Sequence, residues 1–111
     1  MIMNIGKLDK KIIIEQYTAV TTPSGFDEAK WVSYKTVWAS INNLWGKEYY
    51  AAKATNEEKT VEFTIRYFKD LENLNTTKYR LNWGGRAFNI TFIDNIQYAN
   101  KWLKIKAIEQ N

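Results

Sequence analysis

The strongest constraint on the fold of this chain is an alternation of apolar and polar residues with a period of two. It is clearest from Thr60 to Phe68, where apolar residues at 61, 63, 65 and 67 alternate with polar residues at 62, 64 and 66. Successive side chains of a β-strand point to opposite faces, so this pattern is typical of a strand with one buried face. The chain is therefore expected to be rich in half-buried strands.

Six segments share this character and are predicted to be strands, at residues 10–17, 31–41, 60–68, 79–83, 86–93 and 101–109. They are rich in the β-branched and aromatic residues that favour strands. In the fifth segment, Phe88, Ile90 and Phe92 are expected to share one face. Gly84-Gly85 predicts a two-residue hairpin, because glycine tolerates the positive φ of such turns. The stretch from Thr18 to Lys30 contains Pro23-Ser24-Gly25 and is expected to be a long hairpin loop.

Residues 44–59 have a different character. The run from Lys47 to Ala54 contains good helix formers and no β-branched residue, and it predicts a short helix of about two to three turns. Short strands with turns at regular spacing favour an antiparallel sheet that closes on itself. We therefore expect an all-β, mainly antiparallel fold: a six-stranded small barrel with one short helix in an insertion at about 44–59. Residues 1–111 are expected to form a single domain.

The composition argues against an enzyme. The chain has no Cys and no His, which removes disulfides, thiolate metal ligands and the commonest general base. Ser24, Ser33 and Ser40 consequently have no His to activate them. Asp70 and Glu72 are only a weak indication of a metal site. We expect no catalytic residues, no cofactor and no metal.

Membrane and export signals are also missing from the sequence. There is no apolar run of 18 residues, and the N-terminus lacks the long apolar segment of a signal peptide. An intracellular protein with no membrane partner is therefore expected. The net charge of +4 is a mild bias that nucleic acids or acidic partners would favour.

Aromatic residues are more numerous than a small interior needs. The chain has five Trp, seven Tyr and five Phe, and a domain of 111 residues cannot bury all of them. Trp38, Tyr67 and Trp102 lie opposite the apolar face of their segments or flank it. They cover the second side of a curled barrel, or they form a subunit interface, or they stack nucleic-acid bases. Basic residues are scattered among acidic ones instead of lining a groove, which favours the interface. The alternative is a small barrel that binds single-stranded nucleic acid.

The order of the motifs resembles the head-closure, or head–tail joining, family of tailed bacteriophages. Four ordered blocks carry the resemblance over nearly the whole chain: Gly6–Leu8 with Ile12–Gln16; Trp31, Val37–Ile41, Leu44 and Gly46–Ala52; Thr64–Tyr67; and Tyr79–Leu81, Gly85–Ile90, Ile93–Asn95 and Trp102–Ile105. Residues 26–30 and 69–78 follow no pattern of that family, and these are loops of the kind that usually carry partner contacts.

The resemblance implies a structural protein of the virion that is assembled in the cytoplasm of the bacterial host and encoded by a phage or prophage. It implies a ring of identical subunits, a dodecamer on the connector, which lies beneath the portal and adaptor proteins. That ring would close the DNA exit channel and meet a tail completion protein, and DNA would pass through it without sequence-specific binding.

For the interface of such a ring, the expected residues are Trp38, Trp45, Tyr49, Tyr50 and Trp102. The resemblance assigns subunit contact and channel narrowing to the insertion. The open alternative is that Tyr50 and Ala54 only cap the barrel of one subunit.

Overall fold

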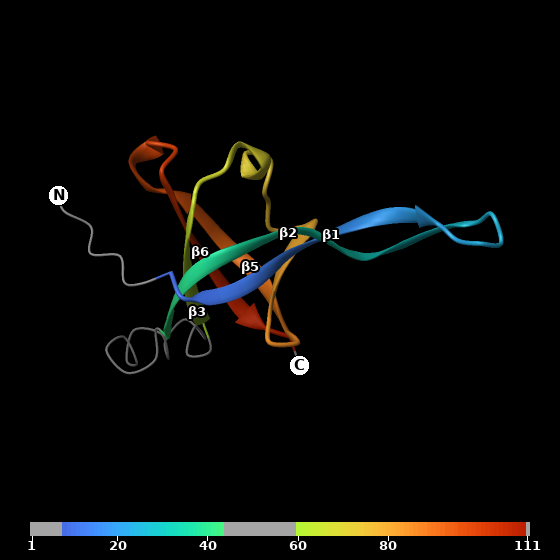
Figure 1. The fold of residues 1–111 in the computed structure, drawn as a ribbon, viewed down its shortest axis with the longest axis horizontal. Helices are drawn as coiled ribbons and strands as arrows, with labels where there is room; N and C mark the ends of the chain where they lie inside the picture. Colours follow the sequence, from blue (N-terminus) through green and yellow to red (C-terminus); the bar gives the residue numbers. More distant parts are fainter. Residues whose placement is uncertain (1–7, 44–59, 111) are drawn as a thin grey trace.

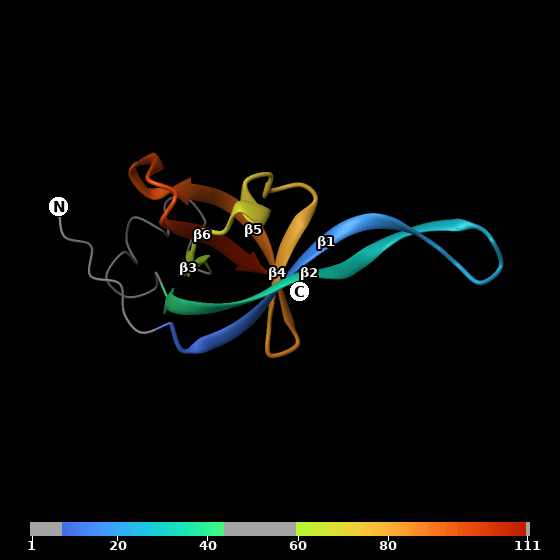
Figure 2. The ribbon, with the colours of Figure 1, turned by 45° about the horizontal axis from the view of Figure 1, so that its top comes forward.

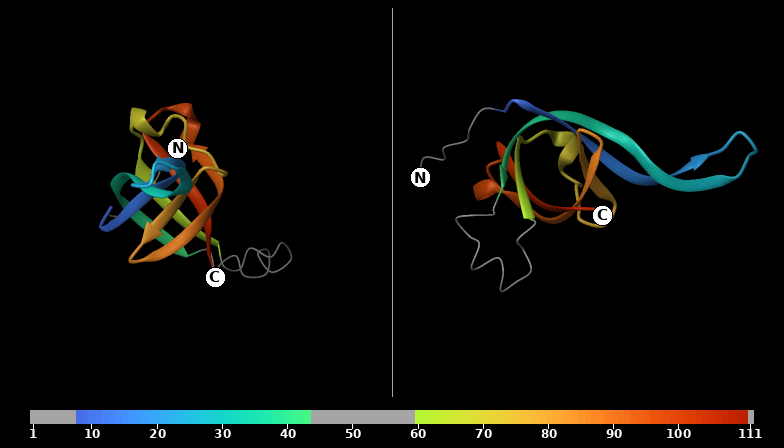
Figure 3. Two further views of the ribbon diagram at one scale, coloured as in Figure 1. Left: turned by 90° about the vertical axis from the view of Figure 1, so that its right-hand side faces the viewer. Right: turned by 90° about the horizontal axis from the view of Figure 1, so that it is seen from below.

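Six strands form the part of the chain that the computed structural model describes, which is residues 8–43 and 60–110. Their bounds are β1 (Lys10–Thr21), β2 (Asp27–Asn43), β3 (Thr60–Arg66), β4 (Tyr79–Trp83), β5 (Arg86–Asn95) and β6 (Trp102–Glu109). The strands close into a barrel in the order β1-β2-β3-β6-β5-β4, and every neighbouring pair is antiparallel (Figures 1 and 3). The predicted six-stranded antiparallel barrel is confirmed.

Helical structure is minor in the described residues. It consists there of two short 3₁₀ turns, η1 (Lys69–Leu71) and η2 (Ile96–Tyr98). Neither is long or apolar enough to cross a membrane. The helix expected within 44–59 lies outside the described residues and stays a prediction.

Alternating residues of all six strands fill the barrel interior. The largest fully buried side chains are Phe63, Phe88, Ile12, Ile14, Ile65, Leu81 and Ile105. Phe63 on β3 and Phe88 on β5 meet edge to face, with ring centroids 5.3 Å apart. Their strands are separated by β6 in the sheet, so the two rings contact across the interior. The small side chains of Ala39 and Ala107 are fully buried beside these large ones, which lets the barrel close tightly.

The expected buried face of β5 is wrong at one residue. Phe88 and Ile90 are buried, but Phe92 is 54% exposed and Ile93 packs against the core instead. The pairing of β5 with β6 shifts by one residue between Ile90 and Phe92. Such a β-bulge adds a residue to one strand and reverses which side chains face inward beyond it.

The hairpin loop expected at Thr18–Lys30 is also wrong, because most of it is strand. β1 continues to Thr21 and β2 begins at Asp27, so the two strands form a long ribbon that leaves the barrel (Figures 1 and 2). The turn is limited to the residues between them. Beyond Gln16, β1 has no strand partner but β2 among the described strands. We call residues 17–31 the arm.

A five-residue connection closes the arm. The N–H of Thr22 donates to the carbonyl of Phe26 (2.8 Å), and the N–H of Gly25 donates to the carbonyl of Thr22 (2.9 Å). Gly25 has a φ of 86°, a left-handed conformation that glycine adopts without strain. Gly84 and Gly85, with φ of 61° and 83°, close the β4–β5 hairpin as the sequence predicts.

Arg80 of β4 holds the base of the arm. Its Nε donates to Glu15 Oε1 at 2.8 Å, and both side chains are less than one-fifth exposed. The same guanidinium lies 4.5 Å from the ring centroid of Trp31, which in turn meets Tyr17 edge to face at 5.1 Å. The Tyr17 N–H donates to the carbonyl of Lys78 (2.8 Å). Glu15 also marks a register shift in β1, so the ribbon bends away from the barrel where Arg80 fixes it.

Tyr79, next to Arg80 on β4, is buried against the barrel. Burial raises the pKa of its phenol, and the neighbouring Tyr34 raises it further. The phenol therefore stays neutral to high pH and accepts a hydrogen bond from Gln16 Nε2 at 3.1 Å.

Phe63→Ala is expected to destabilise the barrel by about 3–5 kcal/mol, because the truncated ring leaves a cavity in a closed core. Urea unfolding followed by circular dichroism measures the change. The matched control is Phe26→Ala in the arm, which should change the unfolding free energy by no more than about 0.5 kcal/mol. Equal losses in the two variants would contradict the described core.

Arg80→Ala is expected to cost about 1–3 kcal/mol, since it leaves the shielded Glu15 carboxylate without its cation. The control is Arg86→Ala. Arg86 makes a two-pronged ion pair with Glu109 (2.6 and 2.8 Å), but its side chain is 53% exposed. Solvent screens an exposed pair of this kind, so Arg86→Ala should be the milder variant in the same unfolding experiment. A larger loss of stability in Arg86→Ala than in Arg80→Ala would contradict the role of Arg80 at the base of the arm.

Candidate subunit interface

The outer wall of the barrel has an aromatic hollow where β2, β3 and β6 lie side by side. We call it the outer hollow. It has a volume of about 480 Å³ and is lined by Leu8, Thr36, Val37, Trp38, Arg66, Phe68 and Trp102. Its three aromatic side chains come from two strands and from the segment after β3. Trp38 is 57% exposed and Phe68 is 39% exposed, so apolar surface faces solvent here.

Strand register brings these side chains together. Trp38 immediately precedes Ala39, which pairs with Ile65, and the next residue of β3, Arg66, pairs with Trp102. The Arg66 guanidinium lies 5.5 Å from the centroid of the Trp102 ring. A cation over an aromatic face is held there by the ring quadrupole. The arrangement places a positive charge between two tryptophans that are 64 residues apart in sequence.

Further cations surround the outer hollow. Lys11 lies directly opposite Trp38 in the β1–β2 pairing, and directly paired residues share a face of the sheet. Lys35 Nζ lies 4.5 Å from the Phe68 ring centroid and 3.1 Å from a carboxylate oxygen of Asp70. Asp70 is thus engaged in an ion pair. Among the described residues, no group of three or more acidic, His or Cys side chains could bind a metal. The surface chemistry is aromatic and basic.

The arm presents a different surface. It carries two acidic residues, Asp27 and Glu28, next to its tip, and its one basic residue, Lys30, lies nearer its base. The large apolar side chain of Phe26, at the tip of the arm, is 75% exposed to solvent. An isolated two-stranded ribbon has no core of its own, and its outer edges have unpaired backbone groups that favour contact with another chain.

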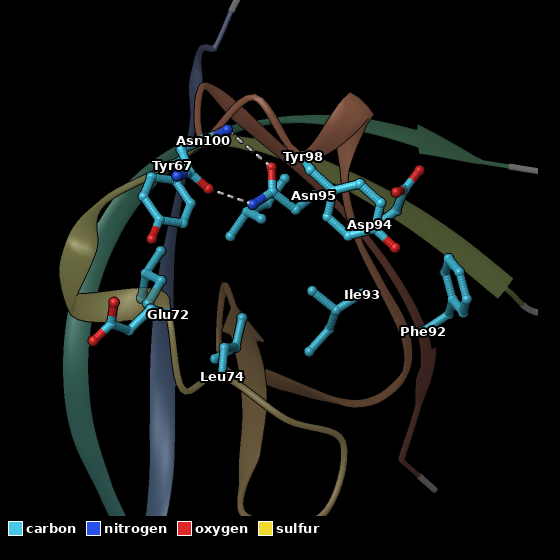
Figure 4. Close-up of a pocket in the computed structure, with 11 residues that line it drawn as sticks. Tyr67, Glu72, Leu74, Phe92, Ile93, Asp94, Asn95, Tyr98 and Asn100 are labelled. Atoms are coloured by element: carbon cyan, nitrogen blue, oxygen red, sulfur yellow. Dashed lines mark hydrogen bonds between the residues drawn. The ribbon is translucent and has the colours of Figure 1, made fainter.

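A second hollow, the rim hollow, lies between the η1 segment and the end of β5 (Figure 4). Its volume is about 530 Å³, and its lining includes Tyr67, Leu74, Ile93, Glu72 and Asp94. Side chains from both segments and from the β5–β6 connection surround it in Figure 4.

Backbone geometry shapes the edge of the rim hollow. Gln97, Tyr98 and Asn100 all have positive φ, which is uncommon for residues other than glycine. Asn95 Nδ2 donates to Asn100 Oδ1 (2.7 Å), and the Asn100 N–H donates to Asn95 Oδ1 (3.2 Å). These bonds hold a loop on which Tyr98 is 90% exposed.

The structure brings Trp38 and Trp102, two of the predicted interface residues, into one hollow. Trp45, Tyr49 and Tyr50 lie outside the described residues. Tyr67, grouped with the surface aromatics from its sequence position, is half-buried and packs against the core.

Sequence reasoning missed Phe26 and Tyr98 as exposed aromatics. For Phe26 a signal existed, because it directly follows a Pro-Ser-Gly turn where a core residue is not expected. Tyr98 carried none, because its exposure depends on the backbone turn that holds it.

Comparison with known proteins places this architecture in a family. A model of the phage head completion protein family matches residues 3–110. The solution structure of protein SF1141 from Shigella flexneri 2a has a TM-score of 0.70 to this chain at 30% sequence identity, and the match covers 96% of each chain. No curated protein matches the chain.

A chain from the virion of a native gene transfer agent particle has the same fold. Its TM-score is 0.55 at 17% identity, and the match covers 97% of each chain. The match to the family model spans every described strand, together with the outer hollow and the arm. The chain therefore belongs to the phage head completion protein family, and it is a structural component of the virion and not an enzyme.

Proposed function

We propose that this chain is a ring-forming head-closure subunit. Copies of it assemble beneath the portal and adaptor proteins, close the DNA exit channel after packaging and present a surface to a tail completion protein. DNA passes through the ring without sequence-specific contacts. Family membership supports the assignment to the head of the virion, and the further steps rest on the surface of the molecule.

The observation that carries the proposal is the arm. A ribbon that extends past the barrel gains little from the barrel core, and fixing its backbone costs conformational entropy. Contact with another protein would bury the exposed Phe26 ring and pair the backbone groups of the ribbon edges, and both changes are favourable. Such a projection therefore supports a role in which the subunit contacts neighbours in an assembly.

A ring imposes a further requirement that the surface meets. Identical subunits around a ring make head-to-tail contacts, so two different patches of one molecule must complement each other. The arm tip, with Asp27 and Glu28, and the outer hollow, with Arg66, are separate patches of opposite charge. The predicted contribution of Trp45, Tyr49 and Tyr50 to the ring and of residues 44–59 to narrowing the channel remains part of this proposal.

Binding of single-stranded nucleic acid is the competing function. Stacking platforms usually combine several rings with a basic groove that follows the backbone of the strand. Here Arg66 and the two tryptophans form a single hollow, while Lys35 and Lys104 are engaged by Asp70 and Glu62. This arrangement favours the structural role.

Deleting the gene for this chain from a phage that carries it should give heads that package DNA and then lose it, and tails that remain unattached. The physical reason is that nothing seals the portal channel or joins it to the tail. Nuclease sensitivity of the packaged DNA and electron microscopy of lysates measure both effects. Adding the purified chain to the defective heads should restore DNA protection.

Intact, tailed virions from the deletion strain would contradict the proposal. Salt-sensitive binding of a single-stranded oligonucleotide that Trp102→Ala weakens would instead favour the nucleic-acid function. Light scattering of the chain mixed with portal–adaptor complexes serves as the independent measurement of assembly.

A further inference from the structure

We propose that the arm tip of one copy inserts into the outer hollow of the next copy around the ring. The inserting residues are Phe26, Asp27 and Glu28, and the receiving side chains are Trp38, Arg66, Phe68 and Trp102. This inference rests on the proposed ring and names the contact that would build it. The occupant of the outer hollow is thus a second copy of this chain.

The arm tip is preorganised for insertion. The backbone hydrogen bonds between Thr22 and Phe26, and between Gly25 and Thr22, fix the turn. Thr22 Oγ1 also donates to the Phe26 carbonyl at 2.9 Å, and Thr21 Oγ1 donates to Asp27 Oδ1 at 3.0 Å. A rigid turn loses less entropy on binding than a flexible loop would. The exposed Phe26 ring is therefore presented as a ready anchor.

The outer hollow suits an aromatic anchor. Trp38, Phe68 and Trp102 provide ring faces and edges, and their exposed apolar area would leave water when another ring enters. Aromatic pairs add about 0.5–1.5 kcal/mol beyond the burial of their area. Aromatic anchors that enter a desolvated pocket are the usual sites of high binding energy in interfaces.

Charge selects the orientation of the contact. The arm tip contributes Asp27 and Glu28, and the outer hollow contributes Arg66, with Lys11 opposite Trp38. Opposite charges at the edge of an interface favour the correct register and exclude others.

Charge also argues against the rim hollow as the docking place of the arm tip. It is lined by Glu72 and Asp94, which would repel the acidic tip.

The arm cannot fill the outer hollow of its own chain. Phe26 lies at the arm tip, and Trp38 lies twelve residues later in the barrel portion of β2. At the rise per residue of a strand, the two residues are about 40 Å apart. The arm also points away from the barrel (Figures 1 and 2). A contact between the two patches is therefore intermolecular and head to tail, which closes a ring when the rotation between copies allows it.

Cysteine cross-linking tests the contact, because the chain has no cysteine of its own. The double variant Ser24→Cys with Thr36→Cys places one thiol at the arm tip and one at the edge of the outer hollow. Assembled on portal–adaptor complexes and treated with a short bismaleimide, it should give a ladder of multimers of this chain. Each single variant should stay monomeric on a denaturing gel. The control pair, Ser24→Cys with Glu72→Cys, probes the rim hollow and should give no ladder.

Two further variants measure the energetics. Phe26→Ala should lower the yield of the ladder about ten-fold or more, the loss expected for an interface anchor. Glu28→Lys should lower it as well, and adding Arg66→Glu should restore part of the yield, since every copy then carries both reversed charges. Unfolding of each variant in urea verifies that the barrel is intact.

The outcomes separate this inference from the proposed ring. If the unmodified chain fails to co-sediment with portal–adaptor complexes, the ring and the inference both fall. If it co-sediments and the double variant gives no ladder, the ring stands and the arm-tip contact is wrong. Dimers from the Ser24→Cys single variant would show a symmetric tip-to-tip contact and would overturn the inference. A ladder from the Glu72 pair would move the docking place to the rim hollow and also overturn it.

Discussion

The pairing between β1 and β4 is the constraint on which the rest of the structure depends. It joins Ile13–Gln16 to residues 79–82 over four residue pairs and closes the sheet into a barrel. Closure removes the free edges that an open sheet would have and encloses the apolar side chains of six strands. Because this pairing ends at Gln16, the rest of β1 pairs with β2 alone and continues with it as the arm. One short ladder thus separates a sealed core from an exposed projection.

Arg80 connects these two regions of the molecule. It pairs with Glu15 at the end of the closing ladder and lies over Trp31 at the base of the arm. The direction of the arm is therefore set by the barrel and is not left to a flexible loop. A rigid projection is what a head-to-tail ring needs, because a small change in its angle would be repeated at every subunit. The proposed ring-forming role makes use of this connection.

Much of the fold could be predicted from the sequence because alternation and turn chemistry are local signals. The six strands, the Gly84-Gly85 hairpin and the inward residues of most strands follow from period two and from positive φ. Phe92 could not be placed, because the β-bulge before it arises from pairing with β6 and leaves no local signature. The length of the arm was hidden for a related reason. The Pro23-Ser24-Gly25 turn signal predicted a long hairpin loop over Thr18–Lys30, and most of these residues become strand because β1 and β2 hydrogen-bond to each other without a core.

For the candidate interface, the sequence by itself determined that the chain has more aromatic side chains than its interior can bury, and that it has no Cys or His. Trp38 and Trp102 could be predicted as surface residues, since each stands opposite the apolar face of its own strand. Only the tertiary structure decided that they lie together with Arg66 between them, because strands distant in sequence become neighbours through barrel closure. It likewise decided that Phe26 stands apart from the core on a fixed turn. Local pattern sets which face a side chain takes, while the strand order sets which side chains meet.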